Sequence, residues 1–281
     1  MLSTFARVTP LMPAADNWLA ADYARHSSLQ EAMAADVLAL LDLCGNEKVL
    51  DVGCGDGRLS ARIADRVPAG EVVGVDASAD MIAFAAAHFG HEGTESHPNL
   101  RFDVNDARAL HFPAEFDLVL SFNALHWVPE QDAALRGIAG ALRAAGRATL
   151  RLVVKGTLCS LEEVAEVTRT SSRWAPHFIG FVDPYLRLDA AQYAALAEGQ
   201  GLNVLSQHTR VMSWDFRTRA AFFGFCRAGF GAWTHRLPED SRDDFIEDVM
   251  RAYQVALGAT PAEAGLFRFY QMDITLARAS R

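Results

Sequence analysis

Hydrophobic residues follow two different spacings along the chain. Between Ser27 and Leu43 they recur every three or four residues and stop before Gly45, which predicts an amphipathic helix that ends at a glycine. From Lys48 to Val154, short apolar and β-branched runs alternate with helical patterns. Such alternation predicts parallel strands joined by right-handed helical crossovers, that is, a doubly wound α/β fold.

The expected elements of this region alternate in order. Strands are predicted at Lys48–Val52, Glu71–Val75, Leu100–Val104, Phe116–Ser121 and Ala148–Val154. Helices are predicted between them at Arg58–Val67, Asp80–His88 and Gln131–Arg143.

The rhythm changes beyond Lys155. Helices predicted at Leu161–Arg169 and Ala190–Ala197, with an aromatic loop between them, indicate a helical cap inserted before the sheet resumes. Two further strands are expected to pair as an antiparallel edge and to enclose a helix; they lie at Asn203–Met212 and Phe267–Arg278, with the helix at Asp240–Leu257. The expected single domain comprises an amino-terminal helical segment (1–45), a core (46–155), a cap (156–200 and 214–262) and the final strands (203–213 and 266–279).

Composition excludes several classes of protein. The chain has 281 residues, 51% of them hydrophobic, which is enough for a sizeable core. Its net charge is -9, and Lys48 and Lys155 are its only lysines, which argues against a general nucleic-acid partner. The apolar runs are too short for a membrane span, and Pro10 and Pro13 interrupt the region that a signal peptide would need. The four scattered cysteines form no CxxC pair, so we expect no metal site and a reducing cytoplasm.

Three glycines at alternate positions follow the first strand. Gly53, Gly55 and Gly57 stand between an apolar strand and a helix, so they expose backbone amides that can meet a carboxylate or phosphate. The dinucleotide fingerprint G-x-G-x-x-G would need a third glycine where Arg58 stands. The spacing therefore disfavours a nicotinamide-dependent oxidoreductase.

Acidic residues end the next two strands. Asp76 is placed to accept both hydroxyls of a ribose, and Asp106 could accept a hydrogen bond from the amine of adenine. Ligands of doubly wound sheets bind at this carboxyl edge, so the glycines and acids together predict a nucleoside ligand.

These motifs show that Lys48–Val154 resembles the class I S-adenosylmethionine-dependent methyltransferases. The resemblance implies a Rossmann-like, mostly parallel sheet of seven strands in the order 3-2-1-4-5-7-6, with the seventh strand antiparallel, and S-adenosylmethionine as cofactor. It also implies that the glycine loop and its preceding acid hold the methionine part of that cofactor. The expected cofactor contacts are Tyr23, Gln30, Asp51, Gly53, Cys54, Gly55, Asp76, Ala77, Met81, Asn105, Asp106, Ala107, Ser121 and Phe122.

The loop after the fourth strand should face the reacting methyl group. Ala124–Trp127, together with Tyr23–Gln30, is similar to the trans-aconitate, juvenile-hormone-acid and malonyl-carrier-protein methyltransferases. That resemblance implies that Gln30 and Trp127 approach a substrate carboxylate. An alcohol or carbon acid would instead need a general base, for which His126 is the nearest candidate; a histidine beside an aromatic ring is equally a packing residue.

The sequence thus predicts methyl transfer to a small molecule, with a carboxylate or hydroxyl oxygen as the favoured acceptor. Aromatic residues in the cap suggest an apolar pocket, and Arg173, Arg187 or Arg227 could supply positive charge for an anionic substrate. Three alternatives stay open: C- or N-methylation of a hydrophobic or aromatic metabolite, a nicotinamide-dependent oxidoreductase, and a cofactor-binding module without catalysis.

Overall fold

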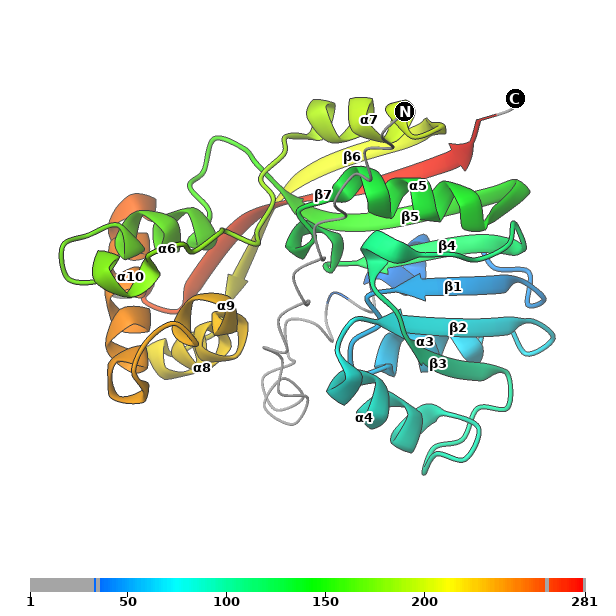
Figure 1. The fold of residues 1–281 in the computed structure, drawn as a ribbon, viewed down its shortest axis with the longest axis horizontal. Coiled ribbons are helices and arrows are strands. Elements are labelled where there is room, and N and C mark those ends of the chain that lie inside the picture. The colour runs from blue at the N-terminus through cyan, green and yellow to red at the C-terminus, as the bar shows by residue number, and fades with distance from the viewer. Residues whose placement is uncertain (1–32, 34–35, 261–262, 280–281) are drawn as a thin grey trace, which may run out of the picture.

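The computed structural model describes residue 33, residues 36–260 and residues 263–279. Within these residues, seven strands form one sheet in the order β3-β2-β1-β4-β5-β7-β6 (Figure 1). The strands are β1 (Lys48–Val52), β2 (Glu71–Asp76), β3 (Leu100–Val104), β4 (Phe116–Phe122), β5 (Leu142–Val154), β6 (Leu202–Asp215) and β7 (Leu266–Arg278). The first five pair in parallel, and β7 runs antiparallel to both β5 and β6. The predicted doubly wound fold and strand order are confirmed.

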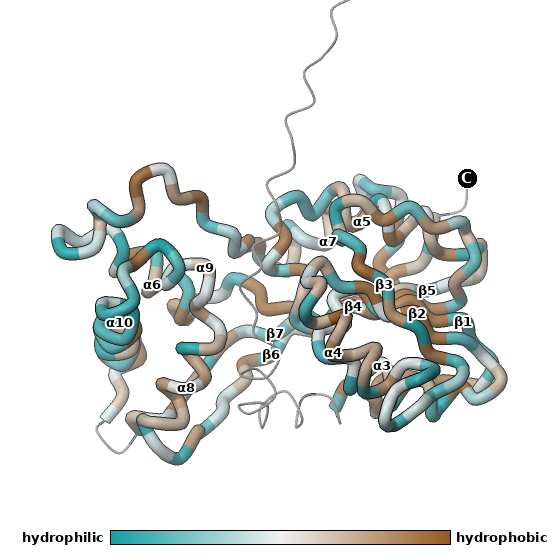
Figure 2. Tube along the Cα trace, turned by 60° about the horizontal axis from the view of Figure 1, so that its bottom comes forward, coloured by the Kyte–Doolittle hydropathy of each residue, from teal (hydrophilic) through white to brown (hydrophobic). Residues whose placement is uncertain are grey.

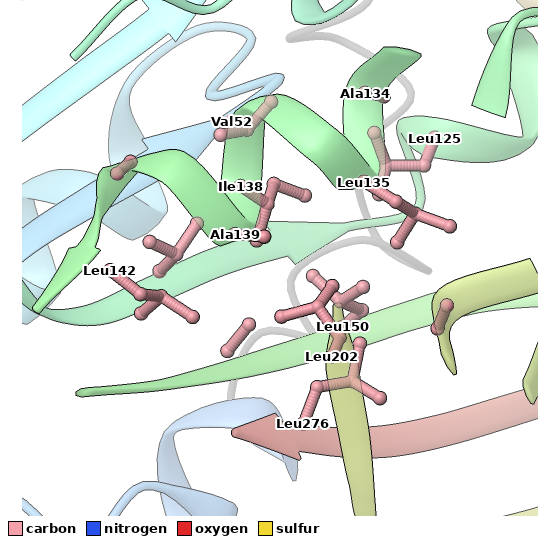
Figure 3. Close-up of a cluster of buried hydrophobic side chains, with 14 of the residues drawn as sticks. Val52, Leu125, Ala134, Leu135, Ile138, Ala139, Leu142, Leu150, Leu202 and Leu276 are labelled. Carbon is pink, nitrogen blue, oxygen red and sulfur yellow. The ribbon is translucent and has the colours of Figure 1, made fainter. Parts of the chain in front are cut away.

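Helices cover both faces of the sheet because its central strands are apolar on both sides. Leu50 and Val52 pack in one buried cluster with α5 (Gln131–Ala141) and α7 (Ala190–Gly199), part of which is drawn in Figure 3. Val49, which precedes Leu50, packs in another cluster on the opposite face. That face is covered by helical residues 36–40, α3 (Arg58–Ala64) and α4 (Ala79–Phe89). Apolar residues accordingly concentrate along the central strands in Figure 2.

A helical cap lies beside the sheet (Figure 1). It contains α6 (Leu161–Arg169), α8 (Arg219–Gly229), α9 (Gly231–Thr234) and α10 (Arg242–Leu257), which share one buried aromatic cluster. The pairing of β5 with β7 ends at Val154 and Tyr270, whereas the β6–β7 ladder continues to Asp215 and Leu266. Phe267 of this extension packs in the cluster of the cap. A two-stranded ribbon therefore connects the sheet to the cap.

Short 3₁₀ helices complete the architecture: η1 (Ala107–Ala109), η2 (Leu125–Trp127), η3 (Ala175–Phe178) and η4 (Glu239–Ser241). Among the described residues, no helix is both long and apolar enough to cross a membrane.

The structure differs from the sequence-based predictions at several boundaries and in the place of one helix. Helix α5 ends at Ala141, and β5 already begins at Leu142, because Leu142 adopts an extended backbone and pairs with Phe116. Helix α3 ends at Ala64, three residues before its predicted end. Helix α7 was assigned to the cap, but its buried Tyr193 and Ala197 pack with α5 against the sheet. Of the helix predicted at Ser27–Leu43, residues 27–32 and 34–35 lie outside the described residues, which show helix at 33 and 36–40.

Candidate active site

A cavity of about 600 Å³ lies at the carboxyl ends of β1 and β4. Its wall includes the glycine loop after β1, Phe122 at the end of β4, Asn123, and Met33 and Val37 from the amino-terminal helical residues. The lining continues along α3 (Arg58–Ala64) and includes Asp65, Phe89, Glu95 and His97. Five of the predicted cofactor residues line this cavity: Asp51, Gly53, Cys54, Gly55 and Phe122.

The glycine loop is fixed by hydrogen bonds to the end of β2. The amide of Gly53 donates to the carbonyl of Val75 at 2.8 Å, and the amide of Gly55 donates to Oδ2 of Asp76 at 3.0 Å. Gly53 has φ 77°, and a Cβ added there would overlap the Cβ of Ala124. Only glycine therefore lets this loop pack against the segment that follows β4.

Two carboxylates flank the loop. Burial raises the pKa of Asp51 from 3.8 to about 6, although Oδ2 accepts a hydrogen bond from the Ser60 hydroxyl at 2.6 Å; the charge of Asp76 acts in the same direction as burial. Burial also raises the pKa of Asp76, whose Oδ1 accepts a hydrogen bond from the amide of Ser78 at 2.9 Å. A carboxylate has about four lone-pair positions, so each acid can still accept hydrogen bonds from a ligand.

The third predicted acid has a local partner. Nε of Arg108 donates to both oxygens of Asp106 at 3.0 and 2.9 Å, and Nη2 donates to Oδ2 at 2.6 Å. Burial acts in the opposite direction, but these hydrogen bonds hold the pKa of Asp106 below its usual value. Its neighbours Asn105 and Ala107 are half-buried, and the amide of Asn105 donates to the carbonyl of Asp76 at 3.0 Å. Contact of Asp106 with adenine stays a prediction. The carboxylate that would make this contact already accepts hydrogen bonds from Arg108.

Seven of the predicted cofactor residues that the structure describes lie outside the cavity lining: Asp76, Asn105, Asp106 and Ala107, already described, and Ala77, Met81 and Ser121. Ala77 is exposed just after β2, and Met81 is buried in the first turn of α4. Ser121 is buried, and its hydroxyl donates to the carbonyl of Val52 at 2.7 Å. Its side chain therefore joins β4 to β1 instead of facing a ligand.

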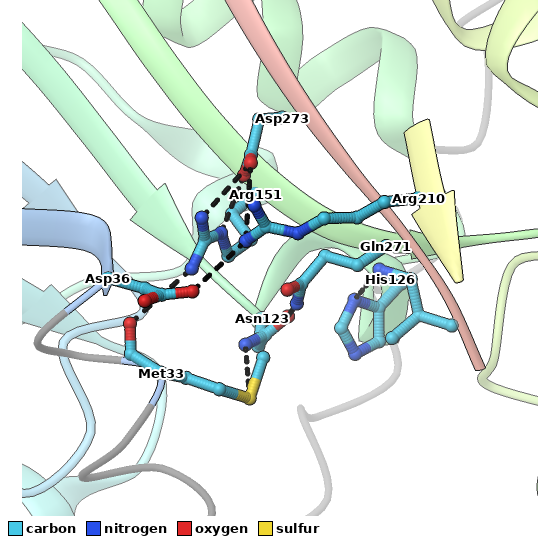
Figure 4. A network of polar contacts seen from close by, with 9 residues as sticks. Met33, Asp36, Asn123, His126, Arg151, Arg210, Gln271 and Asp273 are labelled. Carbon is cyan, nitrogen blue, oxygen red and sulfur yellow. Dashed lines mark hydrogen bonds and ion pairs between the residues drawn. The ribbon is translucent and has the colours of Figure 1, made fainter. Parts of the chain in front are cut away.

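Asn123, the first residue after β4, has an unusual conformation. Its φ is 56°, in the left-handed region that asparagine tolerates better than most residues. Its Oδ1 accepts a hydrogen bond from Nε2 of Gln271 at 3.1 Å, and its Nδ2 lies 3.8 Å from Sδ of Met33 (Figure 4). Both Asn123 and Met33 line the cavity, so this amide belongs to its wall.

A buried ion pair lies behind Asn123. Arg151, whose side chain is 1% exposed, donates to both carboxylate oxygens of Asp273 at 2.5 and 3.0 Å (Figure 4). The carbonyl of Arg151 accepts a hydrogen bond from the amide of Asn123 at 2.7 Å. Arg210 of β6 extends the network to Asp36, with an N–O distance of 3.3 Å. The pair thus fixes the strand that supports Asn123.

His126 does not have the environment of a general base. Its imidazole is buried, and Nδ1 accepts a hydrogen bond from the amide of Val153 at 3.2 Å. Burial lowers the pKa of His126 to about 3. At neutral pH the ring is therefore neutral with its proton on Nε2, whereas a base needs an unprotonated nitrogen facing the substrate. Its ring centroid lies 5.0 Å from that of Tyr185, which favours the packing alternative.

Trp127 forms a wall between the sheet and the cap. Its ring meets Tyr185 edge-on, with centroids 4.9 Å apart, and lies 6.1 Å from that of Trp233 in the cap. Its contact with a substrate stays a prediction. Tyr23 and Gln30, the other residues expected near the methyl group, lie outside the described residues.

Comparisons with known proteins agree with this geometry. A methyltransferase domain family matches residues 49–146. The uncharacterized methyltransferase C70.08c of Schizosaccharomyces pombe is 31% identical over 186 residues, which cover 62% of this chain and 68% of that one. This chain belongs to the methyltransferase family.

Other relatives of this methyltransferase belong to the group that the sequence analysis named. Trans-aconitate 2-methyltransferase of Deinococcus radiodurans is 35% identical over 129 residues, 46% of each chain. Juvenile hormone acid O-methyltransferase of Bombyx mori is 27% identical over 173 residues, 58% of this chain and 60% of that one. The fold is shared with phosphoethanolamine N-methyltransferase 2 of Haemonchus contortus, solved with S-adenosylhomocysteine (TM-score 0.56, 16% identity, 93% of this chain and 57% of that one). The predicted resemblance is confirmed.

The three arginines predicted to supply positive charge for the substrate differ in their exposure and in their hydrogen-bond partners. Arg173 and Arg227 are mostly exposed and pair with acids of α10. Arg187 is 19% exposed; Nη1 bonds to Asp183 and to the carbonyl of Tyr185, while Nε and Nη2 are buried without a hydrogen-bond partner among the described residues. Of these three arginines, only Arg187 therefore has buried donors without a partner among the described residues. Its guanidinium lies over the ring of Tyr185, which in turn contacts Trp127.

Sequence reasoning missed several residues of the methyltransferase site. Met33, Val37 and Asn123 line the cavity, and Gln271 holds Asn123. Asn123 stands in the loop that was expected to face the methyl group, so its position was a usable signal. Gln271 comes from a strand 148 positions later, and no local pattern marks it.

Proposed function

We propose that this methyltransferase uses S-adenosylmethionine to methylate a carboxylate oxygen of a small-molecule acid. The state of His126 carries the proposal. Its pKa of about 3 and the hydrogen bond that its Nδ1 accepts from the Val153 amide leave the imidazole of the loop after β4 unable to take a proton at neutral pH. An alcohol, amine or carbon acid must lose a proton, whereas a carboxylate is already an anion.

Two relatives support this choice of acceptor. Trans-aconitate methyltransferase and juvenile hormone acid O-methyltransferase are both named for acid substrates. Their substrates differ greatly in polarity, so the support extends to the carboxylate and not to a particular acid. Arg187, with its unused buried donors, is our candidate for holding a further anionic group of the acceptor.

Residues at the carboxyl ends of β1 and β2 fit the cofactor: Asp51 lines the cavity, and Asp76, which is not part of the lining, bonds to the lining residue Gly55. Asp76, held by the amides of Gly55 and Ser78, would accept the ribose hydroxyls. Asp51 would hold the amino group of the methionine part, and the space beside Gly55, where nothing lies within 4 Å of a built Cβ position, would receive its chain; the amides of Gly53, Gly55 and Gly57 already donate within the protein. When bound, S-adenosylmethionine supplies a methyl group on a sulfonium; its transfer to a carboxylate oxygen breaks the carbon–sulfur bond and releases no proton.

The chain's own contribution to catalysis would be positioning. Residues after β4 would align one acceptor oxygen with the methyl group, while Trp127 and the cap exclude water from the reacting atoms. Gln30 and Trp127 remain our proposed donors to the acceptor carboxylate.

Radiolabelled methyl transfer tests the proposal. The purified protein is incubated with methyl-labelled S-adenosylmethionine and, separately, with trans-aconitate, other di- and tricarboxylic acids, and long-chain acids. A methyl ester releases volatile labelled methanol when treated with base, whereas N-, C- and ether-linked methyl groups stay in the product. We expect base-labile label from at least one acid.

Two other results would overturn the proposal. Base-stable label would favour C- or N-methylation. Heat on titration with S-adenosylhomocysteine, without any methylated acceptor, would favour a cofactor-binding module without catalysis.

A further inference from the structure

The amide of Asn123 presents a nitrogen donor to the cavity. The hydrogen bond from Gln271 occupies its Oδ1, so its Nδ2 faces the side lined by Met33. Among the described residues, that nitrogen has one hydrogen-bonding contact, the thioether of Met33 at 3.8 Å, and a thioether is a weak acceptor. Within the described part of the chain, no strong acceptor occupies this nitrogen at the cavity wall.

The side chain of Gln271 orients the Asn123 amide through this hydrogen bond. It is fully buried, lies opposite Val153 in β5 and Arg210 in β6, and its Oε1 has no hydrogen-bond partner within the described part of the chain. Leaving a buried carbonyl oxygen without a partner costs stability. An apolar residue at position 271 would avoid that cost, so the glutamine is better explained by what it does to Asn123.

The backbone of Asn123 supports the same conclusion. Its left-handed φ of 56° is held by the bond from its amide to the carbonyl of Arg151, whose side chain is fixed by Asp273. Residues in such sparsely populated conformations cluster at functional sites, where the surrounding structure imposes them. Here backbone and side chain are fixed independently, from β5 and from β7.

We propose that Asn123 orients the acceptor carboxylate through Nδ2, and that Gln271 is the positioning residue that keeps this nitrogen facing the cavity. The inference rests on the proposed function and adds to it the side chain that orients the acceptor carboxylate toward the methyl group. A neutral amide suits this place because it donates to an anion without a positive charge that would repel the sulfonium of the cofactor.

Variants at position 123 test the contact. Asn123→Gly removes the amide and suits the left-handed backbone, so the loop should keep its conformation. Asn123→Asp keeps the bond from Gln271 but presents an oxygen instead of a donor. We expect kcat/KM for trans-aconitate, or for the acid that the wild type methylates best, to fall about tenfold to a hundredfold in the glycine variant and further in the aspartate variant. Calorimetric affinity for S-adenosylhomocysteine should change less than about twofold.

Gln271→Glu tests the positioning role. An ionised glutamate only accepts hydrogen bonds, so it would turn the Asn123 amide and bring Oδ1 to the cavity. We expect a loss of kcat/KM similar to that of Asn123→Gly, with little further loss when both changes are combined. Gln254→Glu in α10 is the matched control, because its amide bonds to the carbonyl of Ala264 in the cap.

The outcomes separate the two levels of the argument. A wild type that methylates no acid refutes the proposed function and this inference together. A wild type that methylates an acid, with Asn123→Gly equally active, overturns the inference and leaves the proposed function standing. Equal losses of cofactor affinity and of kcat/KM would also overturn it, since Asn123 would then serve the cofactor.

Discussion

Replacing Asp51 by asparagine should make the free protein more stable at pH 8 and weaken its binding of the cofactor. Asp51 is buried, with a side chain hydrogen-bonded to the Ser60 hydroxyl. Burial raises the pKa of Asp51 in the folded protein from 3.8 to about 6. Its stabilising contribution is therefore complete below pH 3.8 and is lost as the pH rises through 6.

The magnitude follows from the same two pKa values. At about 1.4 kcal/mol for each pKa unit, the raised pKa of Asp51 lowers the free energy of unfolding by about 3 kcal/mol at pH 8 and by about 1 kcal/mol at pH 4.5. An asparagine avoids both costs and can still accept the hydrogen bond from Ser60. Its amide adds a desolvation cost that does not depend on pH. The stabilisation by Asp51→Asn should thus be about 2 kcal/mol larger at pH 8 than at pH 4.5.

Urea denaturation at the two pH values measures this difference. Asp42→Asn, at an exposed carboxylate outside the cavity, is the control and should change the free energy of unfolding little at either pH. Calorimetry on the same Asp51 variant should show weaker binding of S-adenosylhomocysteine, since the cationic amino group loses its carboxylate. An equal effect of Asp51→Asn at both pH values, or a loss of stability that grows with pH, would refute the reasoning.

Three further predictions concern the other polar groups of the site. Asp76→Ala should weaken binding of S-adenosylhomocysteine by calorimetry about a hundredfold, because it removes the proposed acceptor of the ribose hydroxyls; unchanged affinity would contradict the site. At saturating cofactor and acceptor, kcat should stay level from pH 6.5 to 8.5, because the His126 pKa of about 3 lies far below this range; an inflection near pH 7 that His126→Gln abolishes would restore the base. Asp273→Ala should lower the free energy of unfolding by about 3 kcal/mol because it leaves the Arg151 guanidinium buried and unpaired, and adding Arg151→Met should recover most of the loss; no recovery would contradict this cause.

Local patterns predicted the parts of the site that one stretch of chain builds. The glycine loop, Asp51 and Asp76 belong to two successive β-to-α turns, and the fold places such turns at one edge of the sheet. Their chemistry and spacing therefore predicted that they gather at one edge, while their contact with the cofactor stays a prediction. The sequence also held a signal that was not used: Arg108 stands two residues after Asp106, close enough to occupy its carboxylate.

Burial and register explain what could not be predicted. His126 is a residue type that can act as a general base. Whether it does depends on the burial of its ring and on the hydrogen bond from the Val153 amide, and neither can be read from a pattern of residue types. Helix α7 has the same amphipathic pattern whether it covers the sheet or the cap. Its place is decided by the strand that follows it, β6, and by the cluster it shares with α5.

The reversed strand β7 explains why the acceptor side of the site is the least predictable part. It leaves the cap at Leu266 and enters the sheet beside β5 at Tyr270, so its next residues reach the edge where the cofactor residues gather. Gln271 and Asp273 thereby meet Asn123 and Arg151, from which they are separated by 148 and 122 positions in the sequence. Because the same strand is part of the cap at one end and of this polar network at the other, a change in cap packing would shift the residues that we propose to aim the acceptor. Acceptor choice in this methyltransferase should therefore respond to substitutions in the cap, whereas cofactor affinity depends on β1 and β2.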